Sequence, residues 1–421
     1  MQPTFYNTLS KTQEPIEPRV AGRVKLFTCG PSVYRRQHLG NYRTYLFEDV
    51  LHKYLEYQGY TVERLLNFTD VEDKAVEEAR AKGLSLEELR RPVEEAFFQE
   101  STRLNIRLPK QIPRATTNVD SAVDVIQQLI ARGHAYWHQG DVFFDPLTYE
   151  GFGRLFGLDM SRWPDKKIRF RKDTYPGQRW NLGDFILWHQ RRKQDGDVWW
   201  DTAIGRGRPA WNIQDAAMIR KHLGDQIDIH TGGVDNLYRH HDYTLAIMES
   251  ASGKSFCPFW LHGGHLLVNG EKMSKSKGNV AYLDDFLEQG FSARHIRFFL
   301  LYGPYREKLD CRIPKLEQCA GRLDRIRRMA GSLLTGAVEP PERLDTEPAK
   351  AMRRDFEERM NDNLDIAGAF DAVADHLIRT VNQDQSGALS AAARNELRQL
   401  LIQVDRVFGV LGCAELSAGK T

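Results

Sequence analysis

Two polar strings, far apart in the sequence, have the residue types that phosphate chemistry needs. The first is HLGN at residues 38–41, and the second is KMSKS at residues 272–276. Histidine and lysine can hold phosphate oxygens while their charge shifts in a reaction, and glycine lets a ligand approach the backbone closely. Together the strings predict a site that activates a nucleoside triphosphate. The predicted catalytic residues are His38, Asn41, Lys272 and Lys275.

The elements around these strings support that interpretation. Residues 24–27 have the pattern of a short apolar strand, and the apolar spacing over 45–55 predicts a helix that begins near His38. A helix start exposes unpaired N–H groups and the positive end of its dipole, which favours phosphate. The second string follows a predicted strand, Leu266 to Val268. Each string alone is also typical of a plain feature, a polar helix cap or a solvated lysine loop, and only their pairing favours the phosphate site.

Polar clusters follow two further predicted strands. Thr61 to Asn67 is predicted as a strand that leads into Thr69 and Asp70, and Gln226 to Gly233 leads into Asp235. Ligands bind at the carboxyl ends of the strands in a parallel α/β sheet, so these clusters are expected beside the phosphate site. A plainer interpretation is that Asp70 caps the next helix. A carboxylate after a glycine turn, such as Asp235, is placed to accept hydrogen bonds from ribose hydroxyls.

Several sequence motifs of the chain resemble those of one enzyme family. HLGN resembles the HIGH signature of class I aminoacyl-tRNA synthetases with Asn41 in place of the final His, and KMSKS matches the other signature. TCGPSVY, LLNFTDVEDKA, GRPAWNI and DIHTGGVDNLYRHH occur in the order seen in cysteinyl-tRNA synthetases. The resemblance covers most of the chain. It implies an α/β fold: a Rossmann-like catalytic domain with an inserted subdomain, followed by an all-α helical bundle.

The resemblance also implies ligands and the residues that hold them. ATP with Mg²⁺ would react with an amino acid to give an aminoacyl-adenylate and pyrophosphate. The positions that correspond to ATP- or adenylate-binding residues are Gly40, Gly232, Gly233, Asp235 and Leu267. Those that correspond to amino-acid-binding residues are Cys29, Thr44, Asn67, Thr69, Trp211 and Asp215.

The chain departs from the family at the metal site. Cysteinyl-tRNA synthetases hold a zinc with two cysteines, a histidine and a glutamate, and the zinc binds the substrate thiolate. Here Cys29 and His240 occupy the first and third positions, whereas the second falls on Asp215 and the fourth on Thr244. Asp is a zinc ligand in other proteins and Thr is a poor one. Cys29, Asp215 and His240 thus form a degenerate candidate site for Zn²⁺. Without zinc, Asp215 would favour a substrate with a cationic or donor group, or pair with Arg239 or His241.

Length and composition place limits on the partners. The 421 residues carry a net charge of +2, which gives no general signal for a polyanion. No apolar run approaches a membrane span and no signal peptide is evident, so we expect no membrane partner. Five cysteines without a CxxC motif fit a reducing cytoplasm. The family default is a monomer.

The predicted organisation has three parts. Residues 1–312 form the catalytic domain, with an insertion at about 115–205, residues 313–413 form the helical bundle, and 414–421 form a tail. Cysteinyl-tRNA synthetases carry a further anticodon-reading domain after the bundle. No such domain is expected in these 421 residues, which weakens the expectation of tRNA as the acceptor. The chain is similar in layout to the ligase of mycothiol biosynthesis, which lacks that domain but keeps the zinc ligands. Residues 1–23 are expected to be a polar lead-in and 150–205 irregular.

Four functional hypotheses follow. The first is a ligase that activates an amino acid other than cysteine and passes it to a small amine or carrier. The second is a cysteine–tRNA ligase with an altered metal site. The third is an ATP- or adenylate-binding protein without turnover, and the fourth is a tRNA-binding module without catalysis. Pyrophosphate release separates the first two from the others, and salt-dependent tRNA binding separates the second and fourth from the first.

Overall fold

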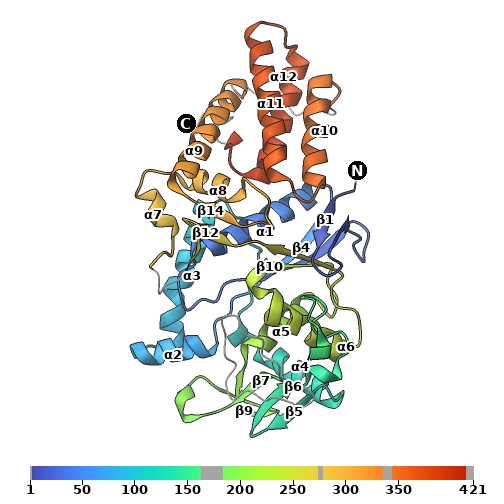
Figure 1. Ribbon diagram of the computed structural model, residues 1–421, viewed down its shortest axis with the longest axis vertical. Helices are drawn as coiled ribbons and strands as arrows, with labels where there is room; N and C mark the ends of the chain where they lie inside the picture. The colour runs from blue at the N-terminus through green and yellow to red at the C-terminus, as the bar shows by residue number, and fades with distance from the viewer. Residues whose placement is uncertain (1, 163–183, 274–277, 335–343, 414–421) are drawn as a thin grey trace.

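The computed structural model describes residues 2–162, 184–273, 278–334 and 344–413 (Figure 1). A parallel sheet lies in the middle of the molecule, with a bundle of helices above it and an antiparallel sheet with further helices below it. Lys275 lies outside the described residues, as does the predicted tail. The predicted α/β catalytic fold followed by a helical region is confirmed.

The central sheet has four parallel strands in the order β11-β10-β3-β4. β3 pairs with β4 through Leu26 and Arg64, and with β10 through Leu26 and Ile229. The buried pattern of β3 is continuous near its end, as expected for a strand covered on both faces. The carboxyl ends of the strands therefore meet at one edge. The strands are β3 (Arg23–Thr28), β4 (Thr61–Leu66), β10 (Ile229–Gly233) and β11 (Phe259–Gly263).

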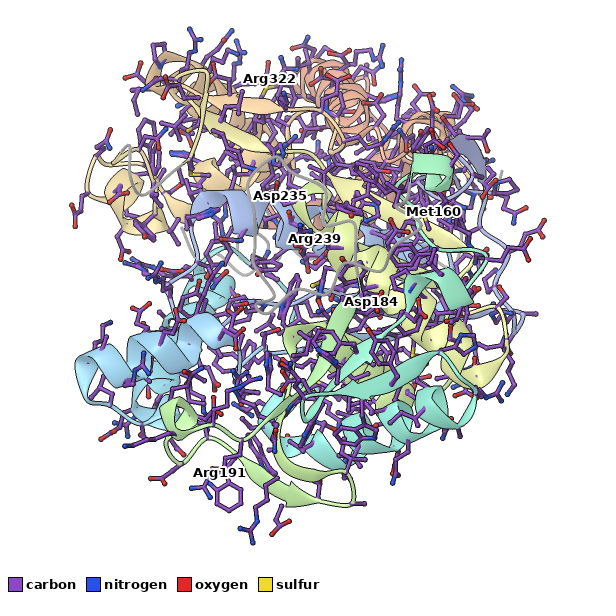
Figure 2. The ribbon with its side chains drawn as sticks, turned by 60° about the horizontal axis from the view of Figure 1, so that its bottom comes forward. Met160, Asp184, Arg191, Asp235, Arg239 and Arg322 are labelled. Carbon is purple, nitrogen blue, oxygen red and sulfur yellow. The ribbon has the colours of Figure 1, made fainter. Side chains whose placement is uncertain are left out.

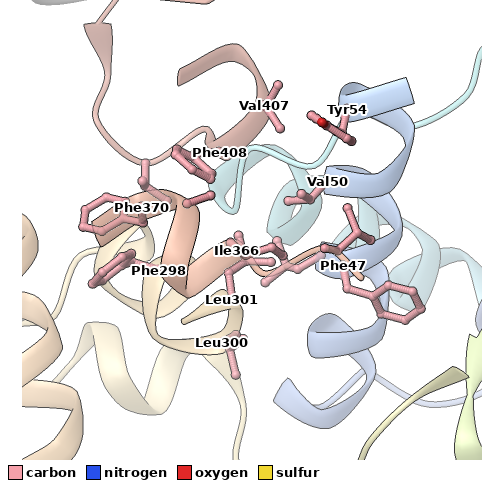
Figure 3. Packing of buried hydrophobic residues seen from close by; sticks show 14 of the residues in the cluster. Phe47, Val50, Tyr54, Phe298, Leu300, Leu301, Ile366, Phe370, Val407 and Phe408 are labelled. Atoms are coloured by element: carbon pink, nitrogen blue, oxygen red, sulfur yellow. The ribbon is translucent and has the colours of Figure 1, made fainter. Parts of the chain in front are cut away.

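Helix α1 (Leu39–Tyr57) crosses from β3 to β4 and connects the sheet to the bundle. Its buried residues contact helices α8 (Ala293–Leu301) and α12 (Ala391–Phe408), as Figure 3 shows for Val50, Leu301 and Phe408. Because sheet, helix and bundle share this apolar cluster, α1 is held along its length.

A buried ion-pair cluster reinforces the same junction. The guanidinium of Arg297 donates to Asp49 Oδ2 at 2.7 Å and to the carbonyls of Leu104 and Phe408. Lys53 Nζ reaches the same carboxylate oxygen at 2.7 Å. Burial pushes the pKa of Asp49 upward, but Lys53 and Arg297 outweigh that effect and lower the pKa to about 2. Arg297 thus ties α1, α8 and the end of α12 together.

The opposite side of the central sheet is covered by a second apolar cluster that includes Phe27, Ile126, Ile219 and Trp260. The covering helices are α4 (Val119–Ala131), α5 (Trp211–His222) and α6 (Asp242–Ser252). Below them lies an antiparallel sheet in the order β5-β6-β7-β9-β8. Its strands are β5 (Ala135–His138), β6 (Asp141–Phe144), β7 (Phe185–Gln190), β8 (Trp200–Thr202) and β9 (Gly205–Pro209).

The remaining elements frame the cleft and build the bundle. A small sheet contains β12 (Leu266–Val268), β13 (Glu271–Lys272) and β14 (Leu309–Cys311). Helices α2 (Asp73–Lys82), α3 (Leu86–Arg103) and α7 (Leu283–Leu287) lie on the left of Figure 1. The bundle contains α9 (Ile313–Leu333), α10 (Glu347–Asn361), α11 (Ile366–Gln385) and α12. The predicted boundary at residue 312 falls between β14 and α9.

Two expectations from the sequence were wrong. The expected polar lead-in contains an antiparallel pair, β1 (Thr4–Asn7) and β2 (Thr12–Pro15), which reaches the bundle because Asn363 N–H donates to the Thr4 carbonyl at 2.9 Å. The expected irregular stretch at 150–205 contains β7, β8 and the start of β9. A stretch rich in tryptophan could either stack on nucleic acid or pack a subdomain. Trp188 in β7 is fully buried, so it packs the inserted sheet.

Candidate active site

A cleft of about 390 Å³ opens at the carboxyl edge of the central sheet. It brings together most of the residues predicted from the sequence. The predicted residues that line it are Cys29, His38, Gly40, Asn41, Thr44, Thr69, Trp211, Gly233, Asp235, His240 and Lys272. Asn67 and Asp215 lie behind this surface, fully buried. The arrangement places the start of α1, the end of β10 and the start of the second signature around one space.

The start of α1 forms one wall of the cleft. His38 is the N-cap residue, and its N–H donates to Asn41 Oδ1 at 3.1 Å. Gly40 lies close to the second string, because a Cβ added there would lie 2.7 Å from Met273 Cε. The HLGN string therefore touches the beginning of the KMSKS string. Asn41 has a structural role at the helix start, which the sequence pattern did not reveal.

Asp235 lies at the opposite wall, near the middle of the molecule in Figure 2. Its Oδ1 lies 2.8 Å from Lys272 Nζ and 3.3 Å from His265 Nε2. Burial raises the pKa of Asp235, but the hydrogen bonds from His265 and Lys272 outweigh it and lower the pKa to about 2. Sequence analysis missed His265, because a single histidine after two glycines carries no pattern of its own.

Two predicted nucleotide-binding residues do not reach the cleft surface. Gly232 packs against the His241 ring and not against the cleft, since a Cβ added there would lie 2.5 Å from that ring. Leu267 pairs with Lys272 between the strands, and it is the neighbouring Leu266 that lines the cleft. The glycine pair was predicted to free backbone for a ligand, and in the structure only Gly233 faces the cleft.

The inner end of the cleft is built on Asp215 from α5. Its Oδ2 lies 2.8 Å from His240 Nε2 and 3.6 Å from Cys29 Sγ, and its Oδ1 accepts from Asn67 Nδ2 at 2.9 Å. The expectation that Asp215 would pair with Arg239 or His241 was wrong, because His240 takes that place. Burial raises the pKa of the Cys29 thiol, and Asp215 and Glu48 raise it further. The thiol therefore stays protonated while the protein is free of metal.

A strained turn delivers the two histidines. Arg239 has a φ of +73° inside the turn Leu237–His241, a conformation that non-glycine residues adopt only when their surroundings enforce it. The turn stacks the His240 ring on Trp211 at 3.8 Å between centroids. His241 Nδ1 lies 2.8 Å from His262 Nε2, behind Gly232. Trp211 and His240 thus form the side wall of the inner pocket.

The zinc ligand set of the resembled family does not fit these residues. Zinc bound by sulfur, nitrogen and oxygen at its usual bond lengths keeps its ligands about 3.4–3.6 Å apart. The separations from Cys29 Sγ agree, but His240 Nε2 and Asp215 Oδ2 lie 2.8 Å apart, a hydrogen bond with a proton between them. Thr244 turns its hydroxyl to the His240 carbonyl at 2.8 Å. Ligand atoms of Cys29, His240 and His241 also lie within 4.8 Å of one another, but His241 is engaged by His262.

Other predicted residues have structural partners. Thr69 N–H donates to the Pro31 carbonyl at 3.0 Å and so joins two loops of the cleft. Thr44 Oγ1 lies 3.6 Å from the position that a Cβ on Gly233 would take. Asp70 does not cap α2 but accepts from the Thr116 N–H at 2.9 Å. The plain interpretation of Asp70 as a helix cap was therefore wrong.

Comparison with known proteins agrees with this geometry. The family model described as the catalytic domain of class I (C) tRNA synthetases matches residues 15–321. The chain is 36% identical over 414 residues to a cysteine–tRNA ligase from Brachyspira hyodysenteriae, covering 97% of this chain and 86% of that protein. It is 38% identical to one from Chlamydia muridarum, covering 97% and 87%.

Solved structures show the same fold. Methionyl-tRNA synthetase from Mycobacterium tuberculosis in complex with methionyl-adenylate matches with a TM-score of 0.66 at 17% identity, covering 94% of this chain and 93% of that one. No helix among the described residues is long and apolar enough to cross a membrane. Fold, cleft and sequence similarity agree, and the chain belongs to the class I aminoacyl-tRNA synthetases, in the family of the cysteine–tRNA ligases.

Proposed function

We propose that the cleft joins ATP to the carboxylate of an amino acid. A carboxylate oxygen attacks the α-phosphorus, the bond to the leaving pyrophosphate breaks, and an aminoacyl-adenylate remains. The observation that supports this most strongly is the meeting of both signatures in one cleft, where Met273 packs on Gly40 and Lys272 lies on Asp235. His38 and the N–H groups at the start of α1 hold the phosphates, and Mg²⁺ accompanies ATP.

The two signature lysines stabilise the charge that moves to pyrophosphate. Lys272 lies in the cleft, and the role of Lys275 rests on the sequence alone. Asp235 and Gly233 hold the ribose. We propose a monomer as the working unit, the default of the resembled family.

We propose that the amino acid has an uncharged side chain and is not cysteine. At the inner end of the cleft, the Asp215 carboxylate is fully buried and is already hydrogen-bonded by His240 and Asn67, so it is not available as a counter-ion. A charged side chain would lose its hydration without gaining a counter-ion. Without zinc there is no thiolate bond to separate cysteine from serine or alanine, and a pocket of this kind distinguishes them poorly.

The acceptor is a hydroxyl or amine that attacks the adenylate carbonyl. We propose a small amine or a carrier in place of tRNA. Four arginines of α9 could meet a tRNA backbone. Arg325 and Arg328 are exposed, whereas the other two are engaged within the bundle. Arg322 pairs with Asp371, and Arg327 donates to the Leu411 carbonyl at 3.0 Å. The net charge of +2 is also small for a polyanion-binding protein.

A second candidate is a cysteine–tRNA ligase that holds zinc through Cys29, Asp215 and His240. The separations of 3.5 and 3.6 Å from Cys29 Sγ favour it, as do the names of the relatives. In this case the hydrogen bond between Asp215 and His240 would open so that both side chains could face the metal.

The test is amino-acid-dependent exchange of pyrophosphate into ATP, measured for the protein amino acids and a few others, with zinc determined on the same sample. Exchange that is driven by an uncharged amino acid at least as well as by cysteine, in protein without zinc, is the expected result. Exchange with cysteine alone and one zinc per chain would establish the second candidate. Absence of exchange with every amino acid, with or without candidate acceptors, would reject the proposed reaction.

A further inference from the structure

One carboxylate oxygen in the cleft is shared by a lysine and a histidine side chain. Asp235 Oδ1 lies 2.8 Å from Lys272 Nζ and 3.3 Å from His265 Nε2. The Asp235 side chain is 58% exposed and the Lys272 side chain 62% exposed, so a ligand in the cleft can reach both. A ribose hydroxyl that donates to this oxygen would therefore compete with the two partners.

The two partners are held very differently. The carbonyl of His265 accepts from Arg43 Nη1 at 2.9 Å and from the Leu309 N–H at 3.0 Å. The carbonyl of Gly264 accepts from the same buried guanidinium at 2.7 Å. Gly264 also has no room for a side chain, since an added Cβ would lie 2.4 Å from the Glu307 carbonyl oxygen. The backbone that carries His265 is therefore fixed from both sides.

Lys272 has much less support. It ends the two-residue strand β13, which pairs with Leu267 and Val268 of β12, and its carbonyl accepts from Asn279 Nδ2 at 3.3 Å. Its long side chain is mostly in solvent, where an ion pair contributes little free energy. Of the two partners of Asp235, Lys272 is the one that a ligand can displace.

We propose that His265 is a positioning residue that holds Asp235 in place while the ribose of ATP displaces Lys272. This inference rests on the proposed function and adds a role that the signature strings do not contain. His265 keeps the carboxylate oriented toward the ribose before and after the exchange. Lys272, once displaced, is free to contact the phosphates. Ribose recognition and the release of a catalytic lysine are thus one event at one oxygen atom.

The proposal predicts opposite effects for the two partners of the same oxygen. His265→Phe keeps an aromatic ring but removes the donor, so it should weaken adenosine binding about tenfold, the size of one hydrogen bond to a charged group. His265→Gln keeps a donor and should stay within about threefold of the wild type. Lys272→Ala removes a competitor, so it should tighten adenosine binding by up to about fivefold. Adenosine has no phosphates for Lys272 to contact.

The experiment is calorimetric titration of the full-length wild type and these three variants with adenosine and with 2′,3′-dideoxyadenosine. The dideoxy compound lacks the hydroxyls, so we expect all four proteins to bind it within about twofold of one another. Melting temperatures of the four proteins verify that each is folded. Affinities for the two nucleosides then separate an effect at the ribose from a general loss of the site.

Two results would overturn the inference. One is an equal loss of affinity for adenosine and the dideoxy compound in His265→Phe, which indicates a merely structural role. The other is weaker adenosine binding in Lys272→Ala, which shows that the lysine helps the ribose site. Failure of the wild type to bind ATP itself would instead reject the proposed function, so the two failures can be told apart.

Discussion

Two carboxylates in this protein have the same lowered pKa of about 2 and serve opposite purposes. Asp49 is a fully buried residue of α1 and is held by Lys53 and Arg297. Asp235 lines the cleft with its side chain 58% exposed and is held by Lys272 and His265. The pKa alone does not distinguish them. Burial does distinguish them. Solvent and ligands cannot reach the ion pairs of Asp49, whereas a ligand in the cleft can displace one partner of Asp235.

The largest expected difference between the two carboxylates is in their contribution to the free energy of unfolding. Asp49→Ala leaves the Arg297 guanidinium buried without its counter-ion, and we expect the free energy of unfolding to fall by about 3–5 kcal/mol. The matched control, Asp235→Ala, should change it by less than about 0.5 kcal/mol because its pair is exposed. Urea unfolding of both variants measures this. Similar losses for the two would show that burial is not what separates them.

The next effect is on catalysis at the exposed cluster. Lys272→Ala should lower kcat for pyrophosphate exchange by about 10²–10³-fold, the range for loss of one group that stabilises transition-state charge. The melting temperature should stay unchanged, since the Lys272 side chain is 62% exposed. The control is Lys53→Ala, which should lower stability instead and leave kcat nearly unchanged. A Lys272→Ala variant with wild-type kcat would remove the lysine from the proposed mechanism.

The pH dependence of the unfolding free energy tests the buried ion pairs of Asp49 separately. The pKa of Asp49 is lowered to about 2 in the folded protein, against about 3.9 in an unfolded chain. The stabilisation is therefore fully present above about pH 5 and is lost as the pH falls toward 2, for a total of about 2–3 kcal/mol. The difference in unfolding free energy between wild type and Asp49→Asn should shrink over that window. A constant difference from pH 5 to pH 2.5 would contradict the pKa assigned to Asp49.

A third carboxylate, Asp215, lies between these two cases. It is buried like Asp49 but belongs to the cleft like Asp235, and its partners are His240, Asn67 and Cys29. Asp215→Ala should reduce stability by about 1–3 kcal/mol, because it leaves buried donors without an acceptor. Asp215→Asn keeps an acceptor for one donor and should cost less. Equal stability of all three proteins would mean that the cluster is not formed in solution.

Much of the architecture could be predicted from local pattern. The run of apolar residues after Val24, the glycine turn and the helix that begins after His38 gave a correct first β-α unit, and Ile313 does begin the helical region. The pairing of β1 with β2 could not be predicted, because it depends on contacts with Asn361 and Asn363 more than 350 residues away in sequence. The strand β8 has only three residues, and β9 consists of glycine, arginine and proline without any apolar alternation.

The candidate site shows the same division. Several residues that the resemblance selected lie together, since His38, Asp235 and Lys272 all line one cleft. It could not show that His240 would be the partner of Asp215, because that contact depends on the strained backbone of Arg239. Nor could it show that Gly232 makes room for His241, or that His265 reaches Asp235. Such contacts are set by tertiary packing and leave no signal in residue spacing.

We propose above that the inner end of the cleft recognises an uncharged amino-acid side chain without zinc. The most direct measurement is the affinity of the protein for a series of non-hydrolysable aminoacyl-sulfamoyl adenosines, with and without a zinc chelator. We expect the cysteinyl compound to bind no more tightly than the best analogue with another uncharged side chain, and the chelator to change nothing. A cysteinyl compound that binds at least about a hundredfold more tightly than all others, and loses that advantage with the chelator, would contradict the account.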